Sequence, residues 1–160
     1  MLRRLLPLCL LALAIALPSH AAEERVGWDD EGDFASALAR AKKAKKLVFV
    51  DFYATWCGPC KLMDRTVYTD STVALETGRY VARKIDAEKG EGIVLAQKYN
   101  VTAYPTLLVV DAAGGEMARE VGYRPADRFT TFLSDTRTGR GTVEGIRKLI
   151  ASKDGNTFDN

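Results

Sequence analysis

Residues 47–61 read LVFVDFYATWCGPCK, and this stretch decides the fold. Positions 47–53 are apolar or aromatic except for one acid, Asp51, a composition typical of a β-strand buried on both faces of a sheet. Cys57 and Cys60 follow directly, and Pro59 between them suits the first turn of a helix because it needs no amide donor there. The stretch therefore predicts a strand followed at once by a helix, with both sulfurs at the junction.

The rest of the chain alternates between strand and helix patterns. We expect helices over 34–46, 61–68, 71–76, 93–99 and 126–135, and strands over 47–53, 81–86, 106–111 and 117–121. Asp33 and either Asp70 or Ser71 are expected to cap the first and third helices. The turn AAGG at 112–115 makes the last strand an antiparallel partner of the one before it. This order predicts an α/β fold, a central mixed β-sheet flanked by helices on both faces.

The first 21 residues have the pattern of a secretory signal peptide. Arg3 and Arg4 precede an apolar run of 13 residues, 5–17, and small residues follow it. The run is shorter than the ~20 apolar residues of a membrane span. We expect cleavage after Ala21 or Ala22, which leaves no stable membrane insertion; the alternative is an uncleaved N-terminal membrane anchor.

With 160 residues, the chain has room for one globular domain. We place this domain at 22–136, with a loose polar lead-in up to residue 32 in which Val26 and Trp28 are available for docking. The extension 137–160 is expected to hold a short helix and a disordered tail. The 23 basic and 21 acidic residues leave a net charge of +2, which offers no basic surface for a nucleic-acid partner.

The composition of the domain excludes several kinds of chemistry. Cys9 and His20 lie in the predicted signal peptide, so the rest of the chain holds two cysteines and no histidine. Ser-His-Asp triads, the Cys-His pairs of proteases and histidine-containing zinc sites all require histidine. Two cysteines cannot form a four-cysteine metal site. We therefore expect no metal and no cofactor, and chemistry that depends on the two sulfurs or on carboxylates.

The spacing of Cys57 and Cys60 suits dithiol chemistry. Positions i and i+3 of a helix share a face, with Cβ atoms ~5 to 6 Å apart, which allows a disulfide to form. The free amides of the first turn lower the pKa of Cys57 below the ~8.5 of a free thiol, so we predict that Cys57 is the nucleophile. Cys60, whose sulfur we expect to be less exposed, would resolve the mixed disulfide. Gly58 leaves the approach to Cys57 open, and Trp56 forms an apolar wall beside it.

Asp51 is the one acid in the predicted buried strand. Burial disfavours a charged carboxylate, so we expect a raised pKa. A carboxylate of raised pKa near the resolving thiol is a candidate proton acceptor for Cys60. The alternative is an aspartate at a strand end whose side chain reaches solvent or an amide.

Residues 51–61 resemble the active-site segment of the thioredoxins, and Tyr104-Pro105-Thr106 resembles the cis-proline element before a later strand of that family. The resemblance covers about residues 38–133 and implies a thioredoxin-like fold. It also implies that Pro105 is cis and faces the cysteine pair, and that the backbone of Tyr104 pairs with an extended substrate segment. Together with Trp56, these two residues are the expected substrate-binding residues.

Within the superfamily, the chain is most similar to exported bacterial thioredoxin-like proteins and to the C-terminal periplasmic domain of the transmembrane disulfide reductase. Two departures stand out. Many thioredoxins place a lysine beside the buried acid, whereas we expect Ala82 at that position, with Arg83 and Lys84 displaced. Tyr104 is also bulkier and more polar than the usual aliphatic residue before the cis-proline.

The resemblance favours a periplasmic or otherwise exported protein-disulfide reductase that acts by thiol-disulfide exchange. Its expected partners are disulfide-containing exported proteins and a membrane electron donor. Gly58 and Pro59 between the cysteines, with Asp51 behind them, resemble the reducing members of the family. The first alternative is a disulfide oxidase or isomerase, in which a histidine commonly lies between the cysteines. The second is a noncatalytic binding module on the same fold, which would not need both cysteines.

Overall fold

The computed structural model describes residues 25–140, so the predicted signal peptide and the helix predicted within the C-terminal extension lie outside the described residues. In chain order the elements are α1 (Phe34–Ala44), β1 (Val48–Tyr53), α2 (Gly58–Thr66), α3 (Ser71–Thr77), β2 (Val81–Asp86), α4 (Glu91–Lys98), β3 (Thr106–Val110), β4 (Glu116–Val121) and α5 (Ala126–Arg137). Each helix and strand expected between residues 34 and 135 is present, with ends that differ by a few residues.

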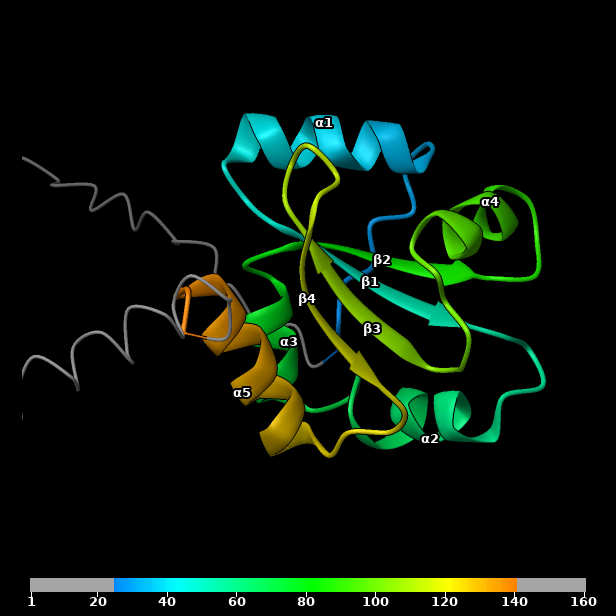
Figure 1. Cartoon of the computed structure of the whole chain (residues 1–160). Helices are drawn as coiled ribbons and strands as arrows, with labels where there is room; N and C mark the ends of the chain where they lie inside the picture. The colour runs from blue at the N-terminus through cyan, green and yellow to red at the C-terminus, as the bar shows by residue number, and fades with distance from the viewer. Residues whose placement is uncertain (1–24, 141–160) are drawn as a thin grey trace, which may run out of the picture.

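The four strands form one mixed sheet in the order β2-β1-β3-β4 (Figure 1). β1 pairs in parallel with β2 and antiparallel with β3, and β3 pairs antiparallel with β4. Helices α1 and α4 cover one face of the sheet, and α2, α3 and α5 cover the other. The predicted α/β class, with helices on both faces of a mixed sheet, is confirmed.

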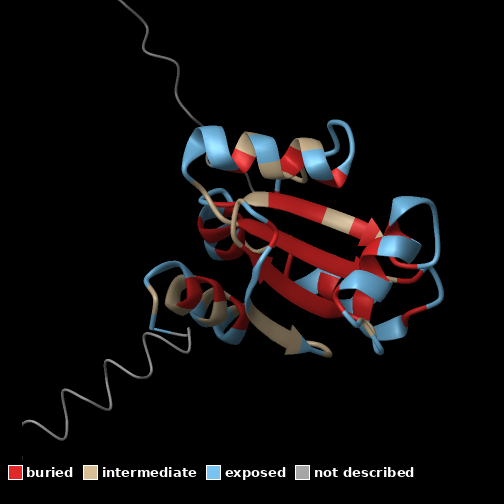
Figure 2. Cartoon of the chain, turned by 45° about the horizontal axis from the view of Figure 1, so that its top comes forward, coloured by how far each residue is buried: buried red, intermediate tan, exposed pale blue. Residues whose placement is uncertain are grey.

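The two faces of β1 belong to two separate parts of the core. Side chains alternate along a strand, so Val48, Val50 and Phe52 pack with α1 and α4, whereas Phe49 packs with α2, α3 and α5. Figure 2 shows β1 and β3 buried along their length, and the helices exposed only on their outer sides. Asp51 is two residues from Phe49, so its side chain points to the same face of the sheet, the face that α2 covers.

The expected helix caps are present. The Asp33 carboxylate accepts a hydrogen bond from the Ser36 amide (2.9 Å), and the Asp70 carboxylate accepts one from the Thr72 amide (2.8 Å). Of the two candidates for the third helix, the structure therefore selects Asp70. The first helix ends at Ala44, earlier than expected, because Lys45 adopts a left-handed conformation with a φ of 54°.

The lead-in before α1 is docked onto the domain rather than loose. The Val26 amide donates to the carbonyl of Tyr68 (3.0 Å), and the Trp28 ring meets the Tyr68 ring edge-on, with centroids 5.0 Å apart. Arg83 is buried and donates to the carbonyl of Asp29 (2.6 Å). The expectation of a loose segment is wrong for residues 25–32, because the Arg83 guanidinium needs these backbone carbonyls as acceptors.

Gly92 marks a close approach between α4 and the end of β2. A Cβ atom at this position would lie 1.9 Å from the carbonyl oxygen of Asp86, a separation that backbone atoms cannot tolerate. At Gly58 an added Cβ would meet no atom within 4 Å. Packing within the domain therefore requires glycine at position 92 but not at position 58.

We predict that Gly92→Ala lowers the free energy of unfolding by about 1 to 3 kcal/mol, because the backbone must shift to admit the methyl group. Gly58→Ala is the matched control and should leave the stability within about 0.5 kcal/mol of the unmodified protein. Urea denaturation followed by circular dichroism measures both. Equal midpoints for the two variants would contradict the close approach.

Candidate active site

The junction between β1 and α2 places the two cysteines as predicted. β1 ends at Tyr53, α2 begins at Gly58, and Cys57 is the N-cap residue of the helix. The Cys57 sulfur accepts a hydrogen bond from the Cys60 amide (3.1 Å). The two residues form the expected disulfide, with Cα atoms 5.4 Å apart. A thiolate on Cys57 would therefore face a backbone donor and the positive end of the helix dipole.

The two cysteines do not differ in exposure in this disulfide-bonded form. Each is 2% exposed, so the expected lower exposure of Cys60 is not seen. The distinction between them is positional, because Cys57 precedes the helix and accepts the amide hydrogen bond, whereas Cys60 is already in the first turn. This position still favours Cys57 as the attacking sulfur.

An aromatic wall borders the disulfide. The peptide bond between Tyr104 and Pro105 is cis, as the resemblance implied, and Tyr104 packs against the buried cluster that contains both cysteines. Trp56 is 67% exposed, and its ring centroid lies 5.9 Å from that of Tyr104. The structure thus brings both predicted substrate-binding aromatic side chains to one side of the pair. That Pro105 itself contacts substrate stays a prediction.

Glu88 belongs to the same wall and was not predicted. Its carboxylate accepts a hydrogen bond from the indole nitrogen of Trp56 (3.0 Å). Burial, followed by the carboxylates of Glu88 and Asp86, raises the pKa of Tyr104. In the sequence, Glu88 belongs to the acidic stretch 86–91, which is typical of a solvated turn. No local pattern indicates that this stretch forms a hydrogen bond with Trp56.

Asp51 lies fully buried on the face of β1 that α2 covers. Neither carboxylate oxygen has a hydrogen-bond partner within residues 25–140. Burial raises the pKa of Asp51 to about 7, and Lys84 and the Tyr68 hydroxyl offset only part of this effect. The Tyr68 hydroxyl directs its own hydrogen bond to the Met63 sulfur (3.9 Å). The predicted rise is confirmed, and the alternative of a solvent-exposed or amide-bonded aspartate is wrong.

The residue beside Asp51 on β2 is Lys84, which corrects the expectation of Ala82. In the parallel pairing of the two strands, Val48 aligns with Val81, so Ala82 aligns with Phe49 and Lys84 with Asp51. The Lys84 ammonium does not pair with Asp51, however. It forms an ion pair with Asp64 of α2.

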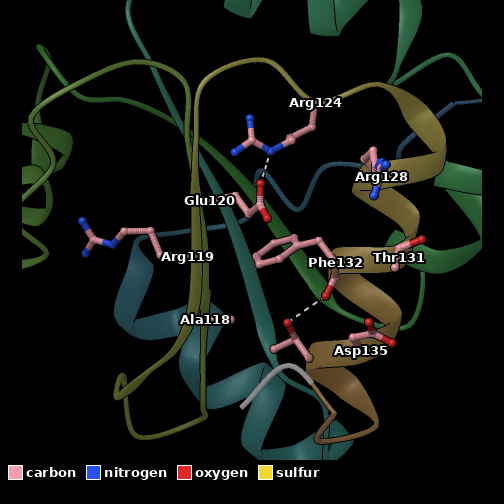
Figure 3. Close-up of a pocket in the computed structure, with 9 residues that line it drawn as sticks. Ala118, Arg119, Glu120, Arg124, Arg128, Thr131, Phe132 and Asp135 are labelled. Atoms are coloured by element: carbon pink, nitrogen blue, oxygen red, sulfur yellow. Dashed lines mark hydrogen bonds and ion pairs between the residues drawn. The ribbon is translucent and has the colours of Figure 1, made fainter. Parts of the chain in front are cut away.

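A cavity of about 570 Å³ lies between β4 and α5 (Figure 3), but none of the predicted site residues lines it. Its lining includes Arg124, which pairs with Glu120 four residues earlier, and Asp135, which pairs with Arg140. Arg119 points away from α5 in Figure 3 and pairs with Glu116. Because none of its lining residues belongs to the β1–α2 junction or to the Tyr104–Pro105 segment, we assign the cavity no part in the chemistry of the cysteines.

The family described as a thioredoxin-like domain matches residues 34–137. The chain belongs to this family. Over 94 residues it is 42% identical to Thioredoxin-1 of Saccharomyces cerevisiae, a match that covers 59% of this chain and 82% of that protein. It is 31% identical over 131 residues to the thiol:disulfide interchange protein DsbD of Tatumella citrea, covering 78% of this chain but only 23% of that relative.

A solved structure supports the same assignment. The oxidised C-terminal domain of Neisseria meningitidis DsbD has a TM-score of 0.57 and 25% identity, and the match covers 70% of this chain and 99% of that domain. With its Cys57–Cys60 pair, this member of the family is a thioredoxin-like thiol-disulfide oxidoreductase.

The described residues offer neither a metal site nor a membrane-spanning helix. Within residues 25–140, no group of three or more His, Cys, Asp or Glu side chains is arranged to hold a metal ion. Nor does any helix in this part of the chain have the length and apolar character needed to cross a membrane.

The raised pKa of Asp51 predicts a stability that depends on pH. Between about pH 4 and pH 7 the folded protein holds a proton on Asp51 that the unfolded chain has released, so stability falls as the pH rises through this window. The shift from 3.8 to about 7 corresponds to roughly 4 kcal/mol.

Asp51→Asn cannot ionise, so we expect this variant to lose most of that decrease and to be the more stable protein above pH 7. Urea denaturation of the disulfide-bonded protein at pH 4, 5.5, 7 and 8.5 measures the difference. If the two proteins show the same pH dependence, Asp51 is not buried as an uncompensated acid.

Proposed function

We propose that this protein is a reductase that acts on the disulfides of exported proteins by thiol-disulfide exchange at Cys57 and Cys60. The observation that carries the proposal is the placement of Asp51, a buried acid with a pKa of about 7 on the α2-covered face of the strand that leads into the cysteines. A purely structural disulfide has no need of such a group. It would also close a loop of minimal length and add little stability.

The reaction proceeds in two exchanges. The Cys57 thiolate attacks one sulfur of a client disulfide, forms a mixed disulfide, and releases the other client sulfur as a thiolate that takes a proton from water. Cys60 then gives its proton to Asp51 and attacks the Cys57 sulfur. The Cys57–Cys60 disulfide forms, the second client sulfur leaves and is protonated, and two electrons have passed from the pair to the client.

The surface around the pair suits an extended client segment. No backbone hydrogen bond within residues 25–140 uses the N–H or carbonyl of Tyr104, so both remain available for pairing with a client strand. The exposed ring of Trp56 offers apolar contact next to this backbone. Gly58 leaves room for a client segment to approach the cysteines, because no atom lies within 4 Å of the position that a Cβ would occupy there. Trp56, Tyr104 and Pro105 are accordingly the proposed substrate-binding residues.

We infer the reducing direction from the composition of the active-site segment. Gly58 and Pro59 separate the cysteines, with no histidine between them to stabilise the thiolate further. We propose that the signal peptide at 1–21 exports the protein, with cleavage after Ala21 or Ala22, and that a membrane disulfide reductase supplies its electrons.

Two serine variants test the assignment of the sulfurs. We predict that reduced Cys60→Ser forms a stable mixed disulfide with a client such as insulin, because the attacking thiol is present and the resolving thiol is missing. The matched variant Cys57→Ser should form at most a trace of adduct, and both variants should lose catalytic turnover. Intact-mass spectrometry detects the adduct, and peptide mapping locates it. An adduct on Cys60 in the Cys57→Ser protein, at a comparable rate, would reverse the assigned roles.

A further inference from the structure

Two carboxylates on different elements lie within the reach of one ammonium group. Lys84 of β2 is the direct neighbour of Asp51 in the sheet, and both side chains lie on the face covered by α2. Asp64 projects from α2 onto this same face and forms an ion pair with the Lys84 ammonium. Within the described residues, the Asp51 carboxylate has neither an ion-pair nor a hydrogen-bond partner.

The position of the Lys84 ammonium is defined by more than the ion pair. The nitrogen lies 5.0 Å from the ring centroid of Tyr53, 5.5 Å from that of Tyr68 and 5.8 Å from that of Trp28. Aromatic faces attract cations at such distances. The Lys84 side chain is only 18% exposed, so solvent screens these interactions less than those of a surface lysine.

We propose that Asp64 is a positioning residue that holds the Lys84 ammonium away from Asp51 and thereby keeps Asp51 a strong enough base to take the proton of Cys60. This proposal rests on the proposed function, in which Asp51 is the proton acceptor. Without the negative charge of Asp64, the strongest remaining attraction for the ammonium is the ionised Asp51 carboxylate beside it.

Among the described residues around Asp51, Lys84 and Asp64 carry the charges that act on its carboxyl group. The Tyr68 hydroxyl, which follows α2, stays protonated because burial and then Asp51 raise its pKa far above the usual value. On β3, the residue aligned with Asp51 is Leu107, which carries no charge. Of the charged groups, Lys84 lowers the pKa of Asp51 and Asp64 raises it.

The test is a carbon-13 NMR titration of the Asp51 side-chain carboxyl in the disulfide-bonded protein, where the cysteines do not titrate. Asp64 is 42% exposed, so Asp64→Asn should fold. We expect this variant to lower the Asp51 midpoint by about one pH unit, because the freed ammonium turns to Asp51. Lys84→Met should raise the midpoint. In the Lys84→Met background, Asp64→Asn should lower the Asp51 midpoint by less than half of its effect in the unmodified protein. Without the ammonium, the substitution removes only the direct repulsion between the two carboxylates.

Asp135→Asn is the matched control, because Asp135 also lies on a helix, is 36% exposed and is paired, in its case with Arg140. It should leave the Asp51 midpoint unchanged. The proposal is overturned if Asp64→Asn leaves the midpoint in place, or if its effect is the same with and without Lys84.

The pH dependence of client reduction separates this proposal from the proposed function. If Asp51 is the acceptor, the midpoint of the rate profile should move with the NMR midpoint in Asp64→Asn. If the NMR midpoint moves while the rate profile stays fixed, the proposal that Asp64 sets the basicity of Asp51 stands. The same outcome would show that Asp51 is not the proton acceptor in the proposed reaction.

Discussion

The strand β1 is buried on both of its faces, and the positions of the active-site groups follow from this constraint. Helices must cover each side of the strand, and the alternation of its side chains decides which residues meet which helices. Asp51 falls on the side of α2, the helix that carries Cys60. Because only residues 54–57 separate β1 from α2, the strand that buries the acid also positions the disulfide.

Two features of the site have opposite effects on stability. The Cys57 sulfur satisfies an amide at the start of α2, so the reactive group also contributes to the helix as its cap. Asp51, in contrast, is a buried acid without a hydrogen-bond partner in the described part of the chain, and its ionised form destabilises the fold. A buried acid that costs stability, on the strand face covered by the helix that carries Cys60, is better explained by chemistry than by folding.

Local patterns in the sequence were sufficient to predict the fold and the centre of the site. The apolar residues on both sides of Asp51 indicated a buried strand, and the cysteine spacing and Pro59 indicated the start of a helix. The cis bond before Pro105 followed from the resemblance to thioredoxins rather than from the pattern.

Contacts between distant segments could not be predicted in this way. The alignment of Lys84 with Asp51 depends on where β2 begins opposite β1, and composition does not show that offset. Asp64 and Glu88 are ordinary surface acids in the sequence, and their partners lie 20 and 32 residues away. Local patterns in the sequence therefore indicate the cysteine pair and the buried acid, but not the charged side chains that lie around them.

The most direct test of the account is the reduction potential of the Cys57–Cys60 pair, measured by equilibrating the purified protein with dithiothreitol or glutathione mixtures. A reductase supplied by a membrane donor should have a potential near the roughly −270 mV of thioredoxin. A value between about −180 and −120 mV, the range of isomerases and oxidases, would contradict the proposed direction and indicate that the pair forms disulfides in its clients.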